Sequence, residues 1–422
     1  MPFNNDLTRL LKITSPIVLG PMANASGAEL AAATTLGGGF GLLGAGYWSP
    51  ETVKDQMQTA RALIEDDQTE NGQQCTKKVK KNNLRQPFGI GFLVWRLSKA
   101  HGEDVSSLAD INASARTTEG VYSPAVESVE AALRARPKAI WLSFGEPDDL
   151  VAWADFIRRR DAQLSVELRA ENGDEEEEEE DPLVIMVGVG NEEQARHAVE
   201  SIGCDILAVT GNEAGGHGLA ASPSLFTLFP RVAHVLPSLK PRADVKTASP
   251  QPILIGAGGL ASGASLAALL ALGAQGAVFG TRYLLTPEAT YTPAQKDLLK
   301  SLGDVPSSSD SAKENPTGDN LTLRTMAFDD ARNTLDWPAG VDGRGVRNQT
   351  VREYEQDPSD ASREARQKRF AQAAEEKDVE RLVTWAGTGV GVMRDIMPAR
   401  ELTRLLTREA EEALRRAQSQ IA

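Results

Sequence analysis

The sequence predicts an α/β protein: a TIM (β/α)8 barrel followed by a smaller C-terminal lobe of helices and irregular segments. Eight short apolar runs bordered by glycine or proline recur within the first 290 residues, and helical patterns separate them. The runs are continuous and do not alternate with polar residues, as expected for parallel strands covered on both faces. Eight such strands alternating with helices favour a closed barrel over an open doubly wound sheet.

The elements follow one another in a regular order from residue 16 to about residue 285. The predicted strands cover residues 16–20, 39–44, 87–94, 139–145, 183–189, 204–211, 252–259 and 276–281. The predicted helices cover residues 26–35, 126–134, 149–160, 192–201 and 264–271. Residues 251–281 carry no charge and are long enough to cross a membrane, but seven glycines divide them into strand, helix and strand. We interpret that stretch as a buried βα repeat.

Two regions are expected along the chain. Residues 1–290 should form the barrel, with insertions at residues 45–86 and 95–125 and an acidic, disordered loop near residues 171–181. That loop contains nine acidic residues, so the rest of the chain carries −5 of the net charge of −14. Residues 291–422 should form a linker and a lobe that packs on the barrel, with helices near residues 371–385 and 398–418. The last helix is charged all round, so we expect it to lie on the surface or at a subunit contact, outside the core.

The composition argues against several classes of function. A net charge of −14 would repel a polyanion, and five Tyr and six Trp offer few platforms for stacking bases. Two cysteines, Cys75 and Cys204, cannot build a disulfide framework, and the N-terminus shows no secretion signal. We therefore expect a cytoplasmic protein without nucleic-acid or membrane partners and without a metal site, and leave a homo-oligomer open.

The turn after the sixth predicted strand carries the strongest chemical signal. Residues 211–218 read Gly-Asn-Glu-Ala-Gly-Gly-His-Gly, so His217 has glycine on both sides. Glycine lets the backbone take positive φ and approach a flat ligand closely, and an imidazole can gain or lose a proton near neutral pH. Because a barrel places its chemistry in loops at the C-terminal ends of its strands, this position favours a functional role for His217 over that of an ordinary surface histidine. His101, His197 and His234 lie in polar or helical settings that predict no such role.

The turns after the seventh and eighth predicted strands indicate a phosphate site. Gly258 and Gly259 follow one strand, and Gly280 and Thr281 end the other. Barrels commonly bind phosphate at this place through backbone N–H groups, and a monophosphate there suits FMN. Residues 256–261 also match the start of a dinucleotide fingerprint. That interpretation fails because the fingerprint needs an acidic residue about 20 residues further on, and none occurs before Thr281.

Several segments, taken in order, carry a family resemblance. They read Gly-Pro-Met-Ala at residues 20–23, Glu-Ala-Gly-Gly-His at 213–217, Ala-Gly-Gly at 257–259 and Gly-Thr-Arg at 280–282. Together they resemble the nitronate monooxygenase family, formerly called the 2-nitropropane dioxygenases. Residues 344–348 and 385–391 continue the likeness, since they are similar to that family's Arg-Gly-x-Arg-Asn and Trp-Ala-Gly-x-Gly segments. The Glu-Ala-Gly-Gly-His turn is the most specific element.

The resemblance implies a TIM barrel that holds FMN without a covalent bond and uses His217 as its catalytic residue. The flavin ring would lie over the turn at residues 22–23, and the phosphate would lie against the glycines of the last two turns. Family members often have Gln where this chain has Thr210 and Asn where it has Gly91, and both positions would contact the flavin. The residues expected at the flavin are Met22, Ala23, Gly91, Thr210, Gly215, Gly216, Gly258, Gly259, Val278, Phe279, Gly280 and Thr281.

The implied activity is the oxidation of nitronates or nitroalkanes by O₂ to carbonyl compounds and nitrite. A base poised near neutrality suits removal of a weakly acidic α-proton, and its imidazolium form would attract an anionic nitronate. Two alternatives stay open. One is an FMN-dependent reductase that uses NAD(P)H to reduce enoyl thioesters or quinones on the same scaffold. The other is a non-catalytic flavin-binding protein, against which the intact His217 turn argues.

Overall fold

The computed structural model describes residues 3–70, 85–102, 104–109, 122–172, 181–303 and 321–421. Most of the expected acidic loop and parts of the two expected insertions lie outside these ranges. Within them, no helix combines the length and the apolar character that a bilayer crossing requires.

Eight parallel strands form the predicted barrel. Their order around the sheet is β1-β9-β8-β6-β5-β4-β3-β2, and a bridge between Val18 and Phe40 brings the two outer strands together. Every predicted run therefore became a barrel strand, and the continuous apolar pattern corresponds to strands buried on both faces. The strands are β1 (Ile17–Leu19), β2 (Gly41–Gly44), β3 (Gln86–Leu93), β4 (Pro137–Ser143), β5 (Val184–Val189), β6 (Ile206–Thr210), β8 (Ile253–Ala257) and β9 (Gly276–Phe279).

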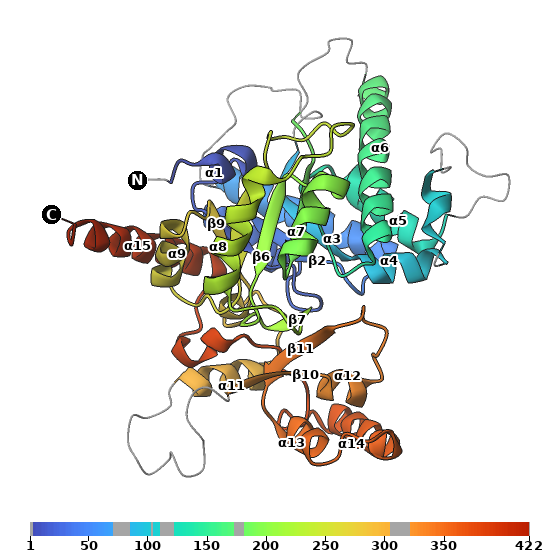
Figure 1. Ribbon diagram of the computed structural model, residues 1–422, viewed down its shortest axis with the longest axis vertical. Coiled ribbons are helices and arrows are strands. Elements are labelled where there is room, and N and C mark those ends of the chain that lie inside the picture. The colour runs from blue at the N-terminus through green and yellow to red at the C-terminus, as the bar shows by residue number, and fades with distance from the viewer. Residues whose placement is uncertain are drawn as a thin grey trace.

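Helices cover the outside of the barrel (Figure 1). Local signals start several of them: the Ser123 hydroxyl accepts the N–H of Val126 at the start of α5, and Ser262 and Ser265 form a capping box on α9. The barrel elements are α1 (Asp6–Leu11), α2 (Ala28–Leu36), α3 (Pro50–Glu70), α4 (Val94–His101), η1 (Val105–Ala109), α5 (Pro124–Arg134), α6 (Pro147–Asn172), α7 (Glu192–His197), η2 (Ala198–Ile202), α8 (Leu225–Val235), η3 (Leu236–Ser238), α9 (Gly263–Ala271) and α10 (Thr281–Leu284). The helix α3 lies within the expected insertion at residues 45–86 and packs on α2 and α5.

A lobe of later residues lies at one end of the barrel (Figure 1). A three-stranded antiparallel sheet, β10-β11-β7, joins the two parts, because β7 (Gly216–Leu219) belongs to the turn after β6 and pairs with β11. The sequence predicted only a turn there. The lobe elements are α11 (Pro293–Gly303), β10 (Thr322–Thr325), α12 (Ala327–Arg332), β11 (Val341–Val346), α13 (Gln349–Gln356), η6 (Asp360–Ser362), α14 (Arg363–Glu376) and η7 (Thr388–Val392). The helix expected at residues 371–385 thus begins earlier and ends at Glu376, where Lys377 takes a left-handed conformation.

The last helix, α15 (Ala399–Gln418), returns to the barrel and packs between α9 and α2. The expectation that it would stay outside the core is wrong, because Leu402 and Leu406 are fully buried members of the main core cluster. A narrow stripe of buried residues, Ala399, Leu402, Thr403, Leu406 and Ala410, runs through its charged sequence. The absence of a side chain at Gly263 permits this contact, since a Cβ there would lie 2.4 Å from the carbonyl oxygen of Leu406.

Candidate active site

A cavity of about 860 Å³ opens where the C-terminal ends of the barrel strands meet the C-terminal lobe. Its size lies within the range of roughly 300–1,000 Å³ typical of small-molecule sites. The loops after β1, β4, β5, β6, β8 and β9 supply one wall, and lobe residues such as Arg332, Trp337 and Trp385 supply the other. The cavity therefore lies at the end of the barrel where TIM-barrel enzymes place their chemistry.

The structure gathers most of the residues that the sequence singled out around this one cavity. The lining includes Met22, Ala23, Thr210, Gly215, Gly216, His217, Gly258, Gly259, Val278, Gly280 and Thr281. Gly91 and Phe279 are not among the lining residues. Gly91 lies beneath the first turn, where a Cβ would come within 2.5 Å of the Cβ of Pro21, and the Phe279 side chain is fully buried in the core. Their expected contact with a flavin stays a prediction, which could be met only through their backbone.

Two glycines after β8 expose their backbone to the cavity. Gly258 and Gly259 have φ values of 115° and 70°, a region that strains any residue with a side chain. A Cβ on Gly259 would also lie 3.0 Å from the Cβ of Glu213. Backbone N–H groups without a neighbouring side chain, here and at Gly280 and Thr281, can approach the oxygens of a phosphate without obstruction. This arrangement is suited to bind a phosphate. These residues fit the phosphate end of FMN. In the part of the chain that the model covers, no cluster of His, Cys, Asp and Glu has a geometry suited to a metal ion.

His217 lies on β7, opposite Gly343 of β11, and its ring is packed on several sides. Its Nε2 lies 3.0 Å from both carboxylate oxygens of Asp329. The indole of Trp337 is stacked on the imidazole, with ring centroids 3.5 Å apart and planes 10° apart, and the ring of Trp385 meets it at 4.9 Å and 61°. The side chain of His217 is 8% exposed and that of Asp329 is 0% exposed. The imidazole is thus held in one orientation.

This environment decides the protonation of His217. A nitrogen between two carboxylate oxygens must carry a proton, so Nε2–H donates to Asp329 and Nδ1 keeps the lone pair. Burial lowers the pKa of His217 below its ordinary value of 6.5, and the hydrogen bond to Asp329 opposes this shift without reversing it. His217 is therefore a neutral base at pH 7, with a carboxylate in place to stabilise the cation it forms on accepting a proton.

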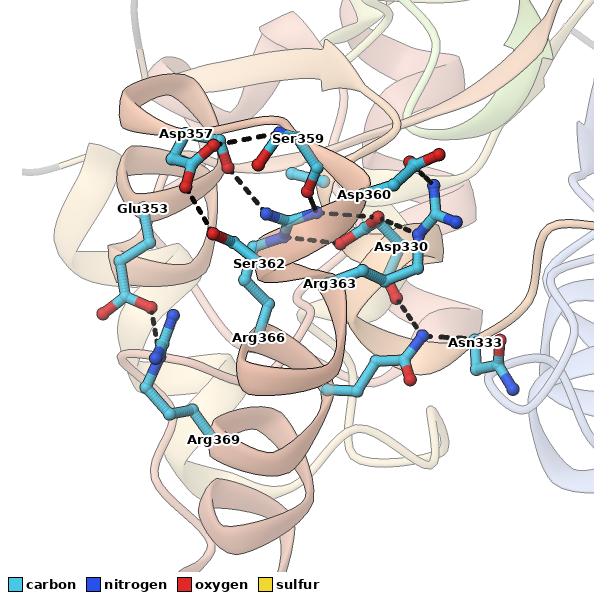
Figure 2. A network of polar contacts seen from close by, with 12 residues as sticks. Asp330, Asn333, Glu353, Asp357, Ser359, Asp360, Ser362, Arg363, Arg366 and Arg369 are labelled. Atoms are coloured by element: carbon cyan, nitrogen blue, oxygen red, sulfur yellow. Dashed lines mark hydrogen bonds and ion pairs between the residues drawn. The ribbon is translucent and has the colours of Figure 1, made fainter.

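The carboxylate of Asp329 is itself held firmly. The hydroxyl of Thr334 donates to its Oδ1 at 2.9 Å. Figure 2 shows that the next residue of α12, Asp330, accepts hydrogen bonds from two arginines of α14: Arg366 Nε at 2.6 Å and Arg363 Nε at 2.8 Å. Because the side chains of Asp330 and Arg366 are both 3% exposed, this ion pair fixes α12, and with it Asp329, against the rest of the lobe.

Arginines of the small sheet hold the turn that carries His217. Arg324 of β10 donates to the carbonyl oxygens of Ala214 at 2.8 Å and Gly218 at 3.3 Å. Arg344 of β11 donates to the carbonyl oxygen of Asn212 at 2.9 Å. The two arginines thus attach backbone carbonyl groups of the turn and of β7 to strands β10 and β11.

The segment at residues 385–389, similar to the family's Trp-Ala-Gly-x-Gly segment, packs on the same turn. The N–H of Thr388 donates to the carbonyl oxygen of Glu213 at 3.0 Å, and the N–H of Gly387 donates to Oγ1 of Thr281 at 2.9 Å. The fit needs glycine on both sides, since a Cβ on Gly215 would lie 2.4 Å from the nitrogen of Gly387. Lobe and barrel therefore meet directly beside the predicted phosphate turns.

The sequence did not identify Asp329, Trp337 or Arg324 as parts of the site. Asp329 lies 112 residues from His217 in the chain, in a segment without a glycine-rich turn. One signal was available, because residues 327–332 read Ala-Phe-Asp-Asp-Ala-Arg, and acids among apolar residues of a short helix need partners if buried. The pattern does not predict which residue pairs with each buried carboxylate.

The sequence is similar to those of known proteins. The sequence matches the family model described as nitronate monooxygenase over residues 4–409. It is 28% identical to a nitronate monooxygenase of Neurospora crassa over 67% of this chain and 66% of that protein, just under two thirds of its length. It is 26% identical to nitronate monooxygenase npaC of Metarhizium robertsii, over 92% of this chain and 89% of that protein.

Solved structures show the same architecture. FabK from Thermotoga maritima superposes with a TM-score of 0.63 at 20% identity, covering 99% of this chain and 100% of that one. A nitroalkane oxidase from Streptomyces ansochromogenes superposes with a TM-score of 0.63 at 23% identity, covering 98% and 100%. At such identities the likeness establishes a shared fold.

Proposed function

The chain belongs to the nitronate monooxygenase family, and from this membership we propose that it oxidises nitronates and nitroalkanes with O₂ to carbonyl compounds and nitrite, with FMN as cofactor. Membership of this family indicates an oxidoreductase that acts on small molecules. The observation that carries the finer proposal is His217 on the wall of the cavity with the buried Asp329 carboxylate behind it. A buried neutral imidazole backed by a carboxylate is suited to remove a weakly acidic α-proton.

The bare turns at Gly258, Gly259, Gly280 and Thr281 would hold the FMN phosphate. The first turn at residues 22–23, with Thr210, Gly215, Gly216 and Val278, would contact the ring system. The flavin, when bound, supplies the electron acceptor and the reactivity toward O₂. The protein supplies position, charge and a place for the substrate between the lobe and the barrel.

In this proposal the residues of the protein itself transfer one proton, and His217 accepts it. With Nε2–H donated to Asp329, His217 can accept the α-proton of a neutral nitroalkane at Nδ1, leaving the substrate as its nitronate anion. The imidazolium that results is stabilised by the Asp329 carboxylate at 3.0 Å and by the face of Trp337 stacked on it. A nitronate supplied as the anion has already lost this proton and does not need the base.

Replacing His217 tests this assignment. His217→Asn should retain the flavin but lose most nitrite formation from a neutral nitroalkane in air, while turnover of the pre-formed nitronate falls less. His234→Asn serves as the matched control, because that side chain is exposed on α8 away from the cavity. Equal turnover of nitroethane by wild type and His217→Asn would reject the assignment of the base.

The same preparation separates the other candidate activities. Rapid anaerobic bleaching of the flavin by NADPH, without nitrite formation from any nitronate, would identify a reductase on this scaffold. Bound flavin with no turnover in either assay would identify a flavin-binding protein without catalysis. Release of a cofactor other than FMN on denaturation would contradict the cofactor assignment.

A further inference from the structure

A second charged group reaches the cavity from the C-terminal lobe: the guanidinium of Arg332, the last residue of α12. Its Cζ lies 5.9 Å from the ring centroid of Trp385, and it contacts the hydroxyl of Tyr47 in the loop after β2. Both neighbours line the cavity, as His217 does. The position of the guanidinium is therefore fixed from two sides of the same space.

Arg332 differs from Arg324, Arg363 and Arg366 of the same lobe in having no acidic partner among the described residues. Arg324 pairs with Asp342 at 3.2 Å, and Arg363 and Arg366 pair with Asp330. Across the described ranges of the chain, no ion pair includes Arg332, and the nearby Asp329 carboxylate is engaged by His217 and Thr334. A guanidinium on the cavity wall without a protein counterion is free to bind a negatively charged group of a ligand.

Tyr47 is held so that its hydroxyl stays beside Arg332. The guanidinium of Arg96 on α4 lies over the Tyr47 ring at 4.5 Å from its centroid. Burial raises the pKa of the Tyr47 hydroxyl, and Arg332 and Arg96 oppose that rise only in part. The hydroxyl is therefore protonated at neutral pH and can donate a hydrogen bond next to the guanidinium.

We propose that Arg332 and Tyr47 form an oxyanion-binding site for the substrate, which would bind the two oxygens of a nitronate in the cavity that His217 also lines. A nitronate is planar and shares its negative charge between two oxygens. The planar fork of a guanidinium suits that geometry better than the point charge of an ammonium group does. This inference rests on the proposed function, and it assigns Arg332 to substrate binding, not to proton transfer.

The test compares Arg332→Met with Arg332→Lys and with Arg352→Met, an exposed arginine of α13 in the same lobe. The first readout is the dissociation constant of nitrate, a planar oxyanion that undergoes no turnover, from titration calorimetry of the flavin-loaded protein. Arg332→Met should weaken nitrate binding by about 10- to 100-fold, as expected for loss of a charge-assisted hydrogen bond. Arg332→Lys should restore part of the affinity, and Arg352→Met should match wild type.

The second readout is steady-state kinetics. Arg332→Met should raise KM for propyl-1-nitronate by a similar factor with little change in kcat, and change KM for neutral 1-nitropropane much less. Unaltered nitrate affinity and unaltered KM in Arg332→Met would overturn the inference, as would absence of nitrate binding to wild type. If nitrate binding depends on Arg332 but no nitronate is turned over, the oxyanion site stands and the proposed reaction fails.

Discussion

Asp329→Asn is the sharpest perturbation of the proposed site, because it removes one charge and changes little volume. Both oxygens of the native carboxylate lie 3.0 Å from Nε2 of His217, and the side chain is fully buried. An amide can present its NH₂ group to Nε2 and so stabilise the tautomer whose proton is on Nδ1. The lone pair then faces away from the substrate, and the imidazolium loses its counterion.

The expected fall in kcat/KM follows from the strength of the hydrogen bond between His217 and Asp329. A hydrogen bond to a charged group contributes about 1.5–3 kcal/mol. If the whole of this contribution is realised in the transition state of proton removal, kcat/KM for a neutral nitroalkane should fall roughly 10- to 150-fold. Turnover of the pre-formed nitronate should fall less, since it needs no base.

The assay is nitrite release from nitroethane and from its nitronate between pH 5 and 8. The carboxylate opposes the burial that lowers the pKa of His217, so its loss should move the inflection of kcat/KM for nitroethane to lower pH. Asp336→Asn, an exposed change of the same charge in the same lobe, is the control. A variant that keeps its flavin and its thermal midpoint but retains full kcat/KM on nitroethane would refute the role of this pair.

Three further outcomes are expected. The wild-type profile of kcat/KM for nitroethane should rise with pH and have its inflection below 6.5, because burial lowers the pKa of His217; an inflection well above 6.5 would point to another base. Arg366→Met should destabilise the lobe by about 3 kcal/mol in chemical unfolding, because it leaves the buried Asp330 carboxylate with one of its two cations; an unchanged midpoint would contradict the ion pair. Gly215→Ala should reduce the flavin bound per protein, since its methyl group would lie 2.4 Å from the nitrogen of Gly387 and displace that segment; full flavin content would show that the turn can relax.

The barrel and its loops follow from features that act over a few residues. Short apolar runs define the eight strands, and glycines at strand ends define turns where a backbone can approach a ligand. The sequence of helix α15 does not reveal its burial, because the buried stripe that includes Leu402 and Leu406 is narrow among many charged residues. The resemblance implies Gly91 and Phe279 at the flavin, whereas the folded chain packs Gly91 against Pro21 and buries the Phe279 side chain, so neither lines the cavity.

The sequence by itself determined that a barrel would form and that His217 would lie in a turn at the C-terminal ends of its strands. Only the tertiary structure decided what surrounds that histidine: β7 pairs with β11, Trp337 covers the ring, and Asp329 holds Nε2 across a separation of 112 residues. The reason is physical. Periodicity and turn conformation depend on neighbours in the chain, whereas burial, ion pairing and the pKa of an imidazole depend on which distant segments fold against it.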